Sequence, residues 1–290
     1  MNINDLNIFI ASAEYGSLTK AATHCNTVQS NVSARIKFLE NELNTKLFIR
    51  STRQIELTPE GTDFLKVAKK ITTSLSDFQR SVNGKNTNPQ GSIRIGCIHT
   101  TAALRAPEIL KDFSQTYSEV EFKLKTETTT ALVKEVLSFK LDGAFVSGPI
   151  AHPDLEVCPV LYEDIVLVSA PTFEGFDKKN IGKPLKIVVF SKGCSYRDLL
   201  ETVLKDRGYR KIKFIEIETL EGIINTVESG IGLTLLPREL IEKQYPYRNL
   251  KIKTLPEKIS KVPTVFIKHK DFPMSEAYSL FFKSIINGYN

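Results

Sequence analysis

The clearest hydrophobic pattern near the start of the chain lies between residues 27 and 43. Val32, Ile36, Leu39 and Leu43 follow one another at intervals of 4, 3 and 4 residues, which places them on one side of a helix. Two shorter helical patterns precede it, one that begins near Asn4 and ends at Gly16 and one that Ser17 caps. The pattern predicts three short helices around one small core.

The opposite face of this third helix is polar and basic. Its candidate DNA contacts are Gln29, Ser30, Asn31, Ser33, Arg35 and Lys37. Gln and Asn side chains pair with base edges, whereas Ser, Lys and Arg side chains reach phosphates. Acidic residues follow at Glu40 and Glu42, where the helix would leave a DNA groove. For such a helix taken alone, the alternative is a polar face that only contacts solvent. The surrounding sequence distinguishes this alternative from a DNA-binding face.

That surrounding sequence predicts a wing. Between Lys46 and Leu57, two short β-type runs flank a polar turn that carries Arg50 and Arg53. Such a turn can lie along a phosphate backbone or enter a minor groove. The first part of the chain is therefore predicted to be a winged helix-turn-helix, with these two arginines as further DNA contacts.

A long helix is predicted next, with Thr58 as its N-cap and Pro59 in its first turn. Its apolar positions follow at intervals of 4, 3, 4, 3 and 4 residues, which is the a/d seam of a heptad pattern. They are Phe64, Ala68, Ile71, Leu75, Phe78 and Val82. Such a stripe commonly packs on its own core, but after a winged helix we expect it to pair two chains. A polar segment from Asn83 to Gly91 then breaks the helix.

After residue 91, short β-rich runs alternate with helical patterns. The strands expected are 92–98, 120–126, 144–147, 187–190, 214–218 and 233–236, and the helices are 101–114, 130–140, 195–206, 220–228 and 275–287. This alternation predicts mostly parallel sheets covered by helices. The units form two clusters joined by residues 154–170, so we expect two lobes with a cleft between them.

The candidate ligand site follows from the rule that open α/β sheets bind ligands beyond the carboxyl ends of their strands, at helix N-termini. The candidate effector-binding residues are His99, Thr100, Thr101, Thr128, Thr129, Thr130, Ser195, Tyr196, Arg197 and Thr219. Hydroxyls, free backbone amides and the Arg197 guanidinium predict a small anionic ligand. A structural ion pair is the alternative role for Arg197.

Cys194 lies in the stretch GCSYR, where an α/β enzyme could carry a nucleophile. The four histidines stand at positions 24, 99, 152 and 269, with no evident partner to orient His99, and the stretch lacks the G-x-S-x-G pattern. We therefore expect no enzyme, no cofactor and no metal site. A thiol sensor that uses Cys97 and Cys194 stays an alternative, although the four cysteines are scattered and form no CxxC pair.

Charge and hydropathy narrow the choice of partners. The chain has 290 residues, a formal net charge of +6 and a pI of about 9.0, which permits a nucleic-acid partner without requiring one. The N-terminus has no basic signal-peptide region, and no apolar run approaches the roughly 20 residues of a membrane span. We expect no membrane partner and a cytoplasmic protein.

Three blocks in a fixed order, GSLTKAA, VQSNVSARIKFLENEL and KLFIRSTRQIELTPEG, resemble the N-terminal domain of LysR-type bacterial transcriptional regulators. LDGAFV and ESGIGLTLLP resemble strand signatures of the same family, so the resemblance covers essentially the whole chain. It implies a recognition helix and wing at the residues named above, dimerisation through the linker helix, and an effector cleft in a fold similar to periplasmic solute-binding proteins. Val28 stands where the family usually has Ser or Thr, so Thr27 is expected to cap the recognition helix, and the Ala34–Arg35 pair also departs from the usual order.

We therefore expect three parts. Residues 1–58 form the winged helix-turn-helix domain, 59–90 the dimerising linker helix and hinge, and 91–290 the two-lobed effector-binding α/β domain, with lobe I at about 91–161 and 268–290 and lobe II at about 162–267. The expected partners are double-stranded promoter DNA, a small anionic effector, and further copies of the chain in a dimer or tetramer, with RNA polymerase as an additional candidate. The alternatives are a redox-responsive regulator of the same fold and a solute-binding protein with an accessory helical domain.

Overall fold

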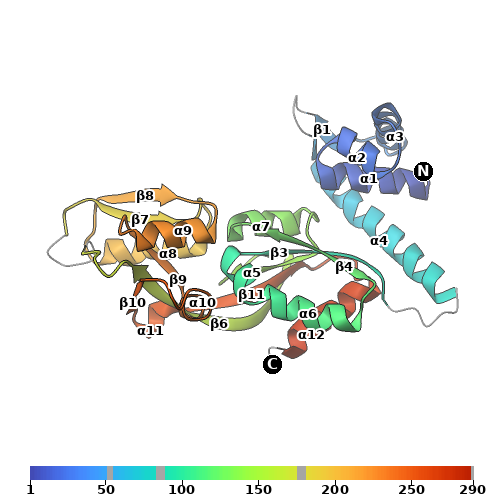
Figure 1. The fold of residues 1–290 in the computed structure, drawn as a ribbon. Coiled ribbons are helices and arrows are strands. Elements are labelled where there is room, and N and C mark those ends of the chain that lie inside the picture. Colours follow the sequence, from blue (N-terminus) through green and yellow to red (C-terminus); the bar gives the residue numbers. More distant parts are fainter. Residues whose placement is uncertain (51–54, 83–88, 175–180, 289–290) are drawn as a thin grey trace.

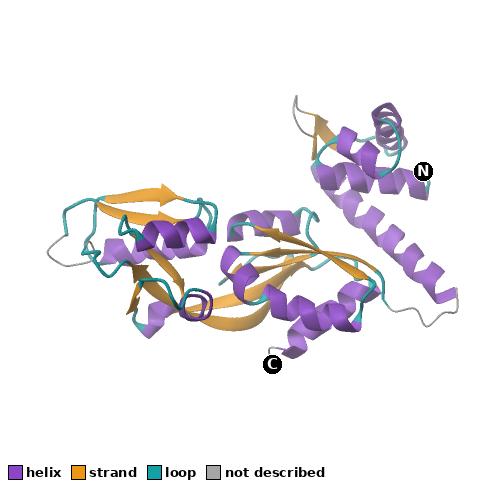
Figure 2. Ribbon diagram, in the orientation of Figure 1, coloured by secondary structure: helices purple, strands orange, loops and turns teal. Residues whose placement is uncertain are grey.

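The computed structural model describes residues 1–50, 55–82, 89–174 and 181–288 (Figure 1). A small helical domain with a two-stranded wing comes first, one long helix follows, and a two-lobed α/β region completes the chain (Figure 2). The expected fold class is confirmed.

The N-terminal domain consists of α1 (Ile3–Tyr15), α2 (Leu18–His24), α3 (Gln29–Glu42), β1 (Phe48–Arg50) and β2 (Ile55–Leu57). The predicted wing is present, since β1 and β2 pair in antiparallel register. Phe9, Ile36 and Leu39 lie fully buried at the centre of the domain core. Val32, Ile36 and Leu39 of the predicted stripe therefore pack inward, whereas Leu43, at the C-cap of α3, is 38% exposed.

The starts of α2 and α4 follow the predicted chemistry, whereas the start of α1 is displaced. Ser17 caps α2, and the Thr58 hydroxyl accepts a hydrogen bond from the Gly61 amide at 2.8 Å, as expected. The cap of α1 is Asn2, not Asn4. The Asn2 side chain accepts from the Asp5 amide while the Asp5 carboxylate accepts from the Asn2 amide, so this reciprocal pair fixes the start earlier.

The long helix α4 (Pro59–Val82) divides its apolar stripe between two surroundings. Phe64 contacts Phe9 with ring centroids 4.8 Å apart, and Ala68 is fully buried in the core of the N-terminal domain. Ile71 and Phe78 are 39% and 64% exposed. The first half of the stripe thus completes the chain's own core, and the second half faces outward. The side chain of Val82 lies outside the described residues.

A single chain of strand pairings runs through both lobes, in the order β4-β3-β5-β11-β6-β9-β7-β8, with β10 paired to β6. Lobe I contains β3 (Gly91–Cys97), β4 (Val120–Thr126) and β5 (Gly143–Ser147), and β3 runs parallel to both β4 and β5. Lobe II contains β7 (Leu185–Val189), β8 (Ile212–Glu216), β9 (Leu233–Pro237) and β10 (Lys251–Thr254). The two long strands β6 (Leu155–Ser169) and β11 (Lys261–His269) connect the lobes.

The helices that cover these strands are α5 (His99–Leu104), α6 (Ala106–Thr116), α7 (Thr129–Leu137), α8 (Ser195–Asp206), α9 (Leu220–Glu228), α10 (Arg238–Gln244), α11 (Glu257–Ser260) and α12 (Glu276–Gly288). The C-terminal helix α12 returns to lobe I and packs beside α6 (Figure 1). The single helix predicted over 101–114 is two helices, because the chain breaks at Arg105 just before Pro107 in the first turn of α6.

The segment expected to be a simple connection, residues 154–170, is largely the strand β6. Its first part, Leu155–Asp164, pairs with β11, and its last part, Ile165–Ser169, pairs with β9 of lobe II. The strand β11 carries the chain back, and its residues Thr264–Ile267 already pair with β5 of lobe I. The return into lobe I therefore begins a few residues before the expected position at 268.

A buried network of charges joins the N-terminal domain and α4 to lobe I. The Lys69 ammonium donates to the Phe139 carbonyl at 2.6 Å and lies 2.9 Å from the Glu14 carboxylate. The Arg94 guanidinium forms ion pairs with both Glu14 and Asp142. Lys69 comes from α4, Glu14 from α1 and Arg94 from β3, so three separate elements converge here. We call these four charged residues the interdomain charge network.

Within the described ranges, none of the helices is both long enough and apolar enough to cross a bilayer.

Candidate functional site

The first turns of α3 present the polar face expected to meet DNA. Gln29, Ser30 and Lys37 are exposed, and Ser33 is half-buried. The expected cap at Thr27 is wrong: the N-cap position is Val28, which makes no side-chain hydrogen bond. The Thr27 hydroxyl instead accepts a hydrogen bond from Asn31 Nδ2 at 2.9 Å. The uncapped amides at the start of α3 are therefore free to meet a phosphate.

Two of the predicted DNA contacts have partners within the chain. The Asn31 amide is used by Thr27, and the Arg35 guanidinium lies 3.4 Å from the carboxylate of Asp5, which is fully buried. A contact of Arg35 with DNA would compete with this ion pair. Gln29, Ser30, Ser33 and Lys37 are the members of the predicted face for which no such internal partner is recorded in the described part of the chain.

Glu40 has a structural role that its position in the sequence did not reveal. It is buried, and its carboxylate accepts hydrogen bonds from the Leu47 and Phe48 amides at 3.1 and 3.4 Å and from Lys46 Nζ at 2.9 Å. Burial raises the pKa of Glu40, but these hydrogen bonds outweigh it and hold the pKa below its usual value. Glu40 thereby fixes the start of the wing against the recognition helix.

The two predicted wing contacts, Arg50 and Arg53, stand at and beyond the edge of the described residues. Arg50 is the last residue of β1 and pairs through its backbone with Ile55, but its side chain lies outside what the structure describes. Arg53 lies outside the described residues altogether.

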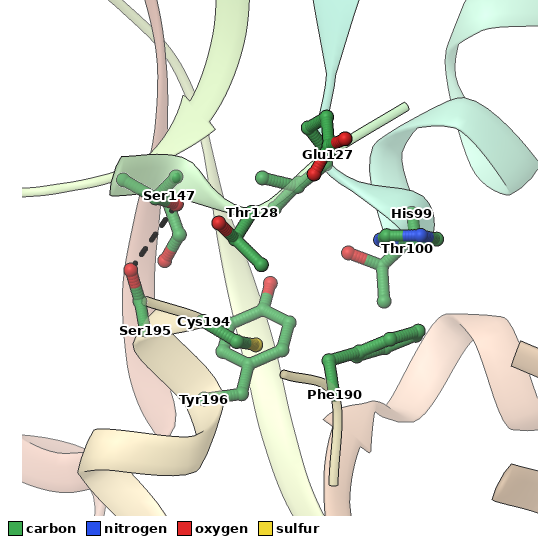
Figure 3. Close-up of a pocket in the computed structure, with 11 residues that line it drawn as sticks. His99, Thr100, Glu127, Thr128, Ser147, Phe190, Cys194, Ser195 and Tyr196 are labelled. Atoms are coloured by element: carbon green, nitrogen blue, oxygen red, sulfur yellow. Dashed lines mark hydrogen bonds between the residues drawn. The ribbon is translucent and has the colours of Figure 1, made fainter. Parts of the chain in front are cut away.

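The second candidate site is a small cavity where the two lobes meet (Figure 3). It lies where α5, α7 and α8 begin, beyond the carboxyl ends of β3, β4, β5 and β7. Its lining residues are Ile98, His99, Thr100, Glu127, Thr128, Thr129, Ser147, Phe190, Cys194, Ser195 and Tyr196. Its volume is about 20 Å³, which holds about one water molecule. The lobes are therefore closed on each other in this structure.

Contacts across the cavity hold the lobes together. The Ser195 hydroxyl of lobe II donates to Thr129 Oγ1 of lobe I at 3.2 Å, and the Thr130 amide donates to the Gly193 carbonyl at 3.3 Å. Gly193 has φ of +98°, and a Cβ at this position would lie 3.0 Å from Thr130 Cβ. A glycine is therefore required here both by the backbone and by the close approach of the lobes.

Two hydroxyls in the cavity lack partners. Ser147 Oγ and the Tyr196 hydroxyl are buried without a hydrogen-bond partner among the described residues, and their residues are 3% and 5% exposed. Burial raises the pKa of Tyr196 more than the nearby Thr100 side chain lowers it, so the Tyr196 hydroxyl stays protonated and able to donate. Unpaired buried hydroxyls cost free energy, which a bound polar ligand or water would offset.

The cavity brings together six of the ten predicted effector-binding residues: His99, Thr100, Thr128, Thr129, Ser195 and Tyr196. The other four do not line it. Thr101 is buried on α5, Thr130 contacts Gly193, and Thr219 caps α9 by accepting from the Gly222 amide. The Arg197 guanidinium lies 2.8 Å from Glu216 and 4.5 Å from the centre of the Phe214 ring. Arg197 thus makes the structural ion pair named above as the alternative.

Five lining residues were not among the predicted contacts: Ile98, Glu127, Ser147, Phe190 and Cys194. Glu127, Ser147 and Phe190 each stand at or just after the carboxyl end of a strand, so the strand-end rule applied to every strand would have found them. The His99 and Phe190 rings stack across the lobes with centroids 4.3 Å apart, which closes one side of the cavity.

Cys97 and Cys194 lie in surroundings that differ from those of reactive thiols. Burial raises the pKa of Cys97 to about 12 and also raises the pKa of Cys194. Reactive thiols instead have lowered pKa values and electropositive surroundings. Within the described ranges, no three His, Cys, Asp or Glu side chains lie together in a way that could hold a metal ion.

Comparison with known proteins assigns the class. Residues 3–62 match the family model for bacterial regulatory helix-turn-helix proteins of the lysR family, and residues 86–288 match the model for the LysR substrate binding domain. The chain therefore belongs to the LysR family of transcriptional regulators, with a DNA-binding helix-turn-helix and an effector-binding domain.

Individual relatives cover nearly the full length. The HTH-type transcriptional regulator GltR of Bacillus subtilis is 39% identical over 281 residues, which is 97% of this chain and 95% of that protein. The HTH-type transcriptional regulator CzcR of Bacillus cereus is 38% identical over 288 residues, covering 98% and 97% of the two chains. These relatives are named as transcriptional regulators rather than enzymes, and the redox-responsive and solute-binding alternatives are not favoured.

Solved structures show the same fold. ArgP from Mycobacterium tuberculosis has a TM-score of 0.75 at 17% identity and covers 99% of this chain and 96% of its own. A full-length OxyR variant from Pseudomonas aeruginosa has a TM-score of 0.74 at 18% identity, with coverage of 98% and 94%. Full-length CbnR in complex with its target DNA has a TM-score of 0.54 at 21% identity and covers both chains completely.

Proposed function

We propose that this LysR-type regulator binds double-stranded promoter DNA through Gln29, Ser30, Ser33 and Lys37 of α3, with the wing as a second contact. The exposure of these four side chains on one helix face supports the assignment. Lys37 would meet a phosphate, and Gln29 would meet a base edge. Because promoter DNA is the proposed partner, the proposed location is the cytoplasm, and RNA polymerase is a further candidate partner.

The cavity between the lobes is the proposed effector site, and the effector carries an anionic group. The two unpartnered buried hydroxyls of Ser147 and Tyr196 carry this proposal. The N-caps of α7 and α8, Thr128 and Cys194, make no side-chain hydrogen bond, and the first amide of each helix, Thr129 in α7 and Ser195 in α8, has no hydrogen-bond partner among the described residues and is available to an anion. Hydroxyl donors and helix amides together suit a carboxylate better than an uncharged group.

Effector binding has to change the lobe arrangement, because a cavity of about 20 Å³ cannot hold a carboxylate-bearing molecule. The ligand would therefore separate the Ser195–Thr129 and Thr130–Gly193 contacts and favour a more open state. A ligand shifts an equilibrium only through its different affinity for the two states. The closed state described above would be the effector-free one.

Dimerisation is proposed through the exposed half of α4. Val67, Ile71 and Phe78 are exposed apolar residues of this helix, and Leu75 is half-buried between them. A second copy of α4 would cover them, while Phe64 and Ala68 contribute to the chain's own core. Two recognition helices would then read two half-sites of an inverted repeat, and a tetramer would form by further association.

A gel shift with promoter and random DNA at moderate salt tests the DNA-binding residues. Gln29→Ala combined with Ser33→Ala should weaken specific binding by at least about tenfold, because base contacts contribute about 1–3 kcal/mol each. Asn41→Ala, on the exposed C-terminal turn of the same helix, is the matched control and should bind like the wild type. Equal binding by all three proteins would refute the assignment of the α3 face.

Thermal unfolding with a panel of small carboxylates tests the effector site. A carboxylate that binds should raise the melting temperature of the wild type and raise it less in Ser147→Ala, because binding to the folded state stabilises it. Ser138→Ala, which alters a hydroxyl outside the cavity, is the control. An equal response in the wild type and Ser147→Ala would remove Ser147 from the site.

A further inference from the structure

Glu127 gives the cavity a charge that an anionic ligand alone does not explain. It directly follows β4, is half-buried, and is the one acidic residue that lines the cavity, while no lysine or arginine lines it within the described residues. Its carboxylate has no recorded ion pair or side-chain hydrogen bond in the described part of the chain. The nearby His99 does not compensate it, since burial lowers the pKa of His99 more than Glu127 raises it.

A purely anionic effector would therefore meet a repulsive carboxylate in a closed, low-dielectric space. A neutral effector would leave Glu127 without a counter-ion as the cavity dehydrates. A cationic nitrogen on the ligand resolves both difficulties, because it forms a charge-assisted hydrogen bond to Glu127 while the anionic group faces the helix amides.

The placement of the polar groups suits a ligand with two charged ends. Figure 3 shows Glu127 and His99 on one side of the cavity and Ser147 and Ser195 on the other, with the Tyr196 hydroxyl pointing between them. The unpartnered hydroxyl of Ser147 thus lies on the side away from Glu127, near the start of α8, and the unpartnered hydroxyl of Tyr196 lies between the two sides. The stacked rings of His99 and Phe190 supply an apolar wall for the remainder of the ligand.

We propose that the effector is zwitterionic, a free amino acid whose ammonium group is bound by Glu127 and whose carboxylate is bound by the N-terminal turns of α7 and α8 and the hydroxyls of Ser147 and Tyr196. The inference rests on the proposed effector site and makes it more specific. It assigns Glu127 as the residue that distinguishes amino acids from simple carboxylic acids of the same shape.

Calorimetric titration of the full-length wild type provides the test. The probes are the twenty protein amino acids, and the four matched acids that lack the amino group of alanine, leucine, glutamate and phenylalanine: propionate, 4-methylpentanoate, glutarate and 3-phenylpropionate. At least one amino acid should bind, and its deaminated counterpart, added to the set where it is not among the four, should bind at least about tenfold more weakly because it loses a charged hydrogen bond. This comparison needs no variant, so it does not depend on how a substitution folds.

Glu127→Gln then tests the residue. The amino acid that binds the wild type should bind this variant at least about tenfold more weakly, while its deaminated counterpart binds at least as tightly as before. Glu121→Gln, on the exposed part of the same strand, is the matched control and should behave like the wild type. Unchanged amino-acid binding in Glu127→Gln would overturn the role of Glu127.

The outcomes separate this inference from the proposed function. If deaminated acids bind the wild type as tightly as the amino acids or more tightly, the zwitterion is refuted while the anionic effector site stands. If no probe of either kind binds, both the zwitterion and the anionic effector are refuted. DNA binding by α3 is unaffected in either case, because it is measured in a separate assay.

Discussion

The interdomain charge network makes a quantitative prediction through Lys69. Its side chain is 8% exposed and contacts the Phe139 carbonyl and the Glu14 carboxylate. Lys69→Met keeps the apolar stem but removes the charge and both hydrogen bonds. Removing one partner of a buried ion pair costs about 3–5 kcal/mol. Glu14 retains Arg94 and is itself partly exposed, so we expect a smaller loss of about 2–3 kcal/mol in the free energy of unfolding.

Urea unfolding followed by far-ultraviolet circular dichroism measures this loss, because the chain contains no tryptophan for fluorescence detection. Lys70→Met is the matched control: Lys70 is the next residue of α4 and is exposed, so its replacement should change the free energy by less than about 0.5 kcal/mol. A double-mutant cycle with Glu14→Gln then isolates the coupling between the two charges.

The proposed stabilising role of Lys69 would be refuted if Lys69→Met and Lys70→Met were equally stable. It would also fail if the Lys69 and Glu14 substitutions were simply additive, since groups in one ion-pair network should couple. Loss of stability together with a separate early transition for the N-terminal domain would show, in addition, that the network couples the unfolding of the two parts.

Three further predictions concern the linker helix, Arg197 and pH. Phe78→Glu should leave the fold intact and raise the dimer dissociation constant, measured by light scattering, by at least about tenfold. Phe64→Glu should instead unfold the N-terminal domain. An intact dimer in Phe78→Glu would contradict the proposed interface. Arg197→Ala should lower the free energy of unfolding by about 1 kcal/mol, because the contacts with Glu216 and Phe214 are lost. A large loss of effector affinity at unchanged stability would instead show that Arg197 binds the effector. Burial lowers the pKa of His99 and His269 below 6.5 in the folded chain. As the pH falls below about 6.5, the unfolded chain therefore takes up protons at these residues that the folded chain does not. The contribution of the two neutral histidines to stability is complete above about pH 6.5 and is lost below it. The urea midpoint should therefore fall between pH 7.5 and 5.5, less so in His269→Gln, and an equal fall in this variant would exclude His269 as a cause.

Patterns that depend on neighbouring residues in the sequence predicted structure well. The intervals of 4 and 3 residues between Val32, Ile36 and Leu39 defined the buried side of α3, and the two β-type runs around the wing paired as expected. The strand β6 was missed because Glu163 and Asp164 interrupt its apolar run. Their partners, Arg105 and Arg238, come from distant parts of the sequence, so no local pattern could reveal that these charges are compensated.

The site was predicted in part for the same reason. Strand ends and following helix starts located six of the cavity residues, because that rule depends on topology alone. The role of Arg197 depends on Glu216 of the neighbouring strand β8, and the role of Glu40 depends on the amides of the wing. Both are tertiary contacts between side chains and partners that sequence spacing does not specify.

The packing of α4 limits how this protein can be divided and recombined. Leu65 and Ala68 are fully buried in the core of the winged helix, which therefore extends beyond the expected boundary at residue 58. A chimera that grafts this DNA-reading unit onto a different sensor would have to carry the first three turns of α4 with it. Those turns include Lys69. If the lobe I of the other protein offered no carbonyl or carboxylate to Lys69, its ammonium group would be buried there without a partner. Lys69 thus constrains the exchange of DNA-binding domains between regulators. A compatible sensor domain is one that offers a hydrogen-bond acceptor to the Lys69 ammonium group.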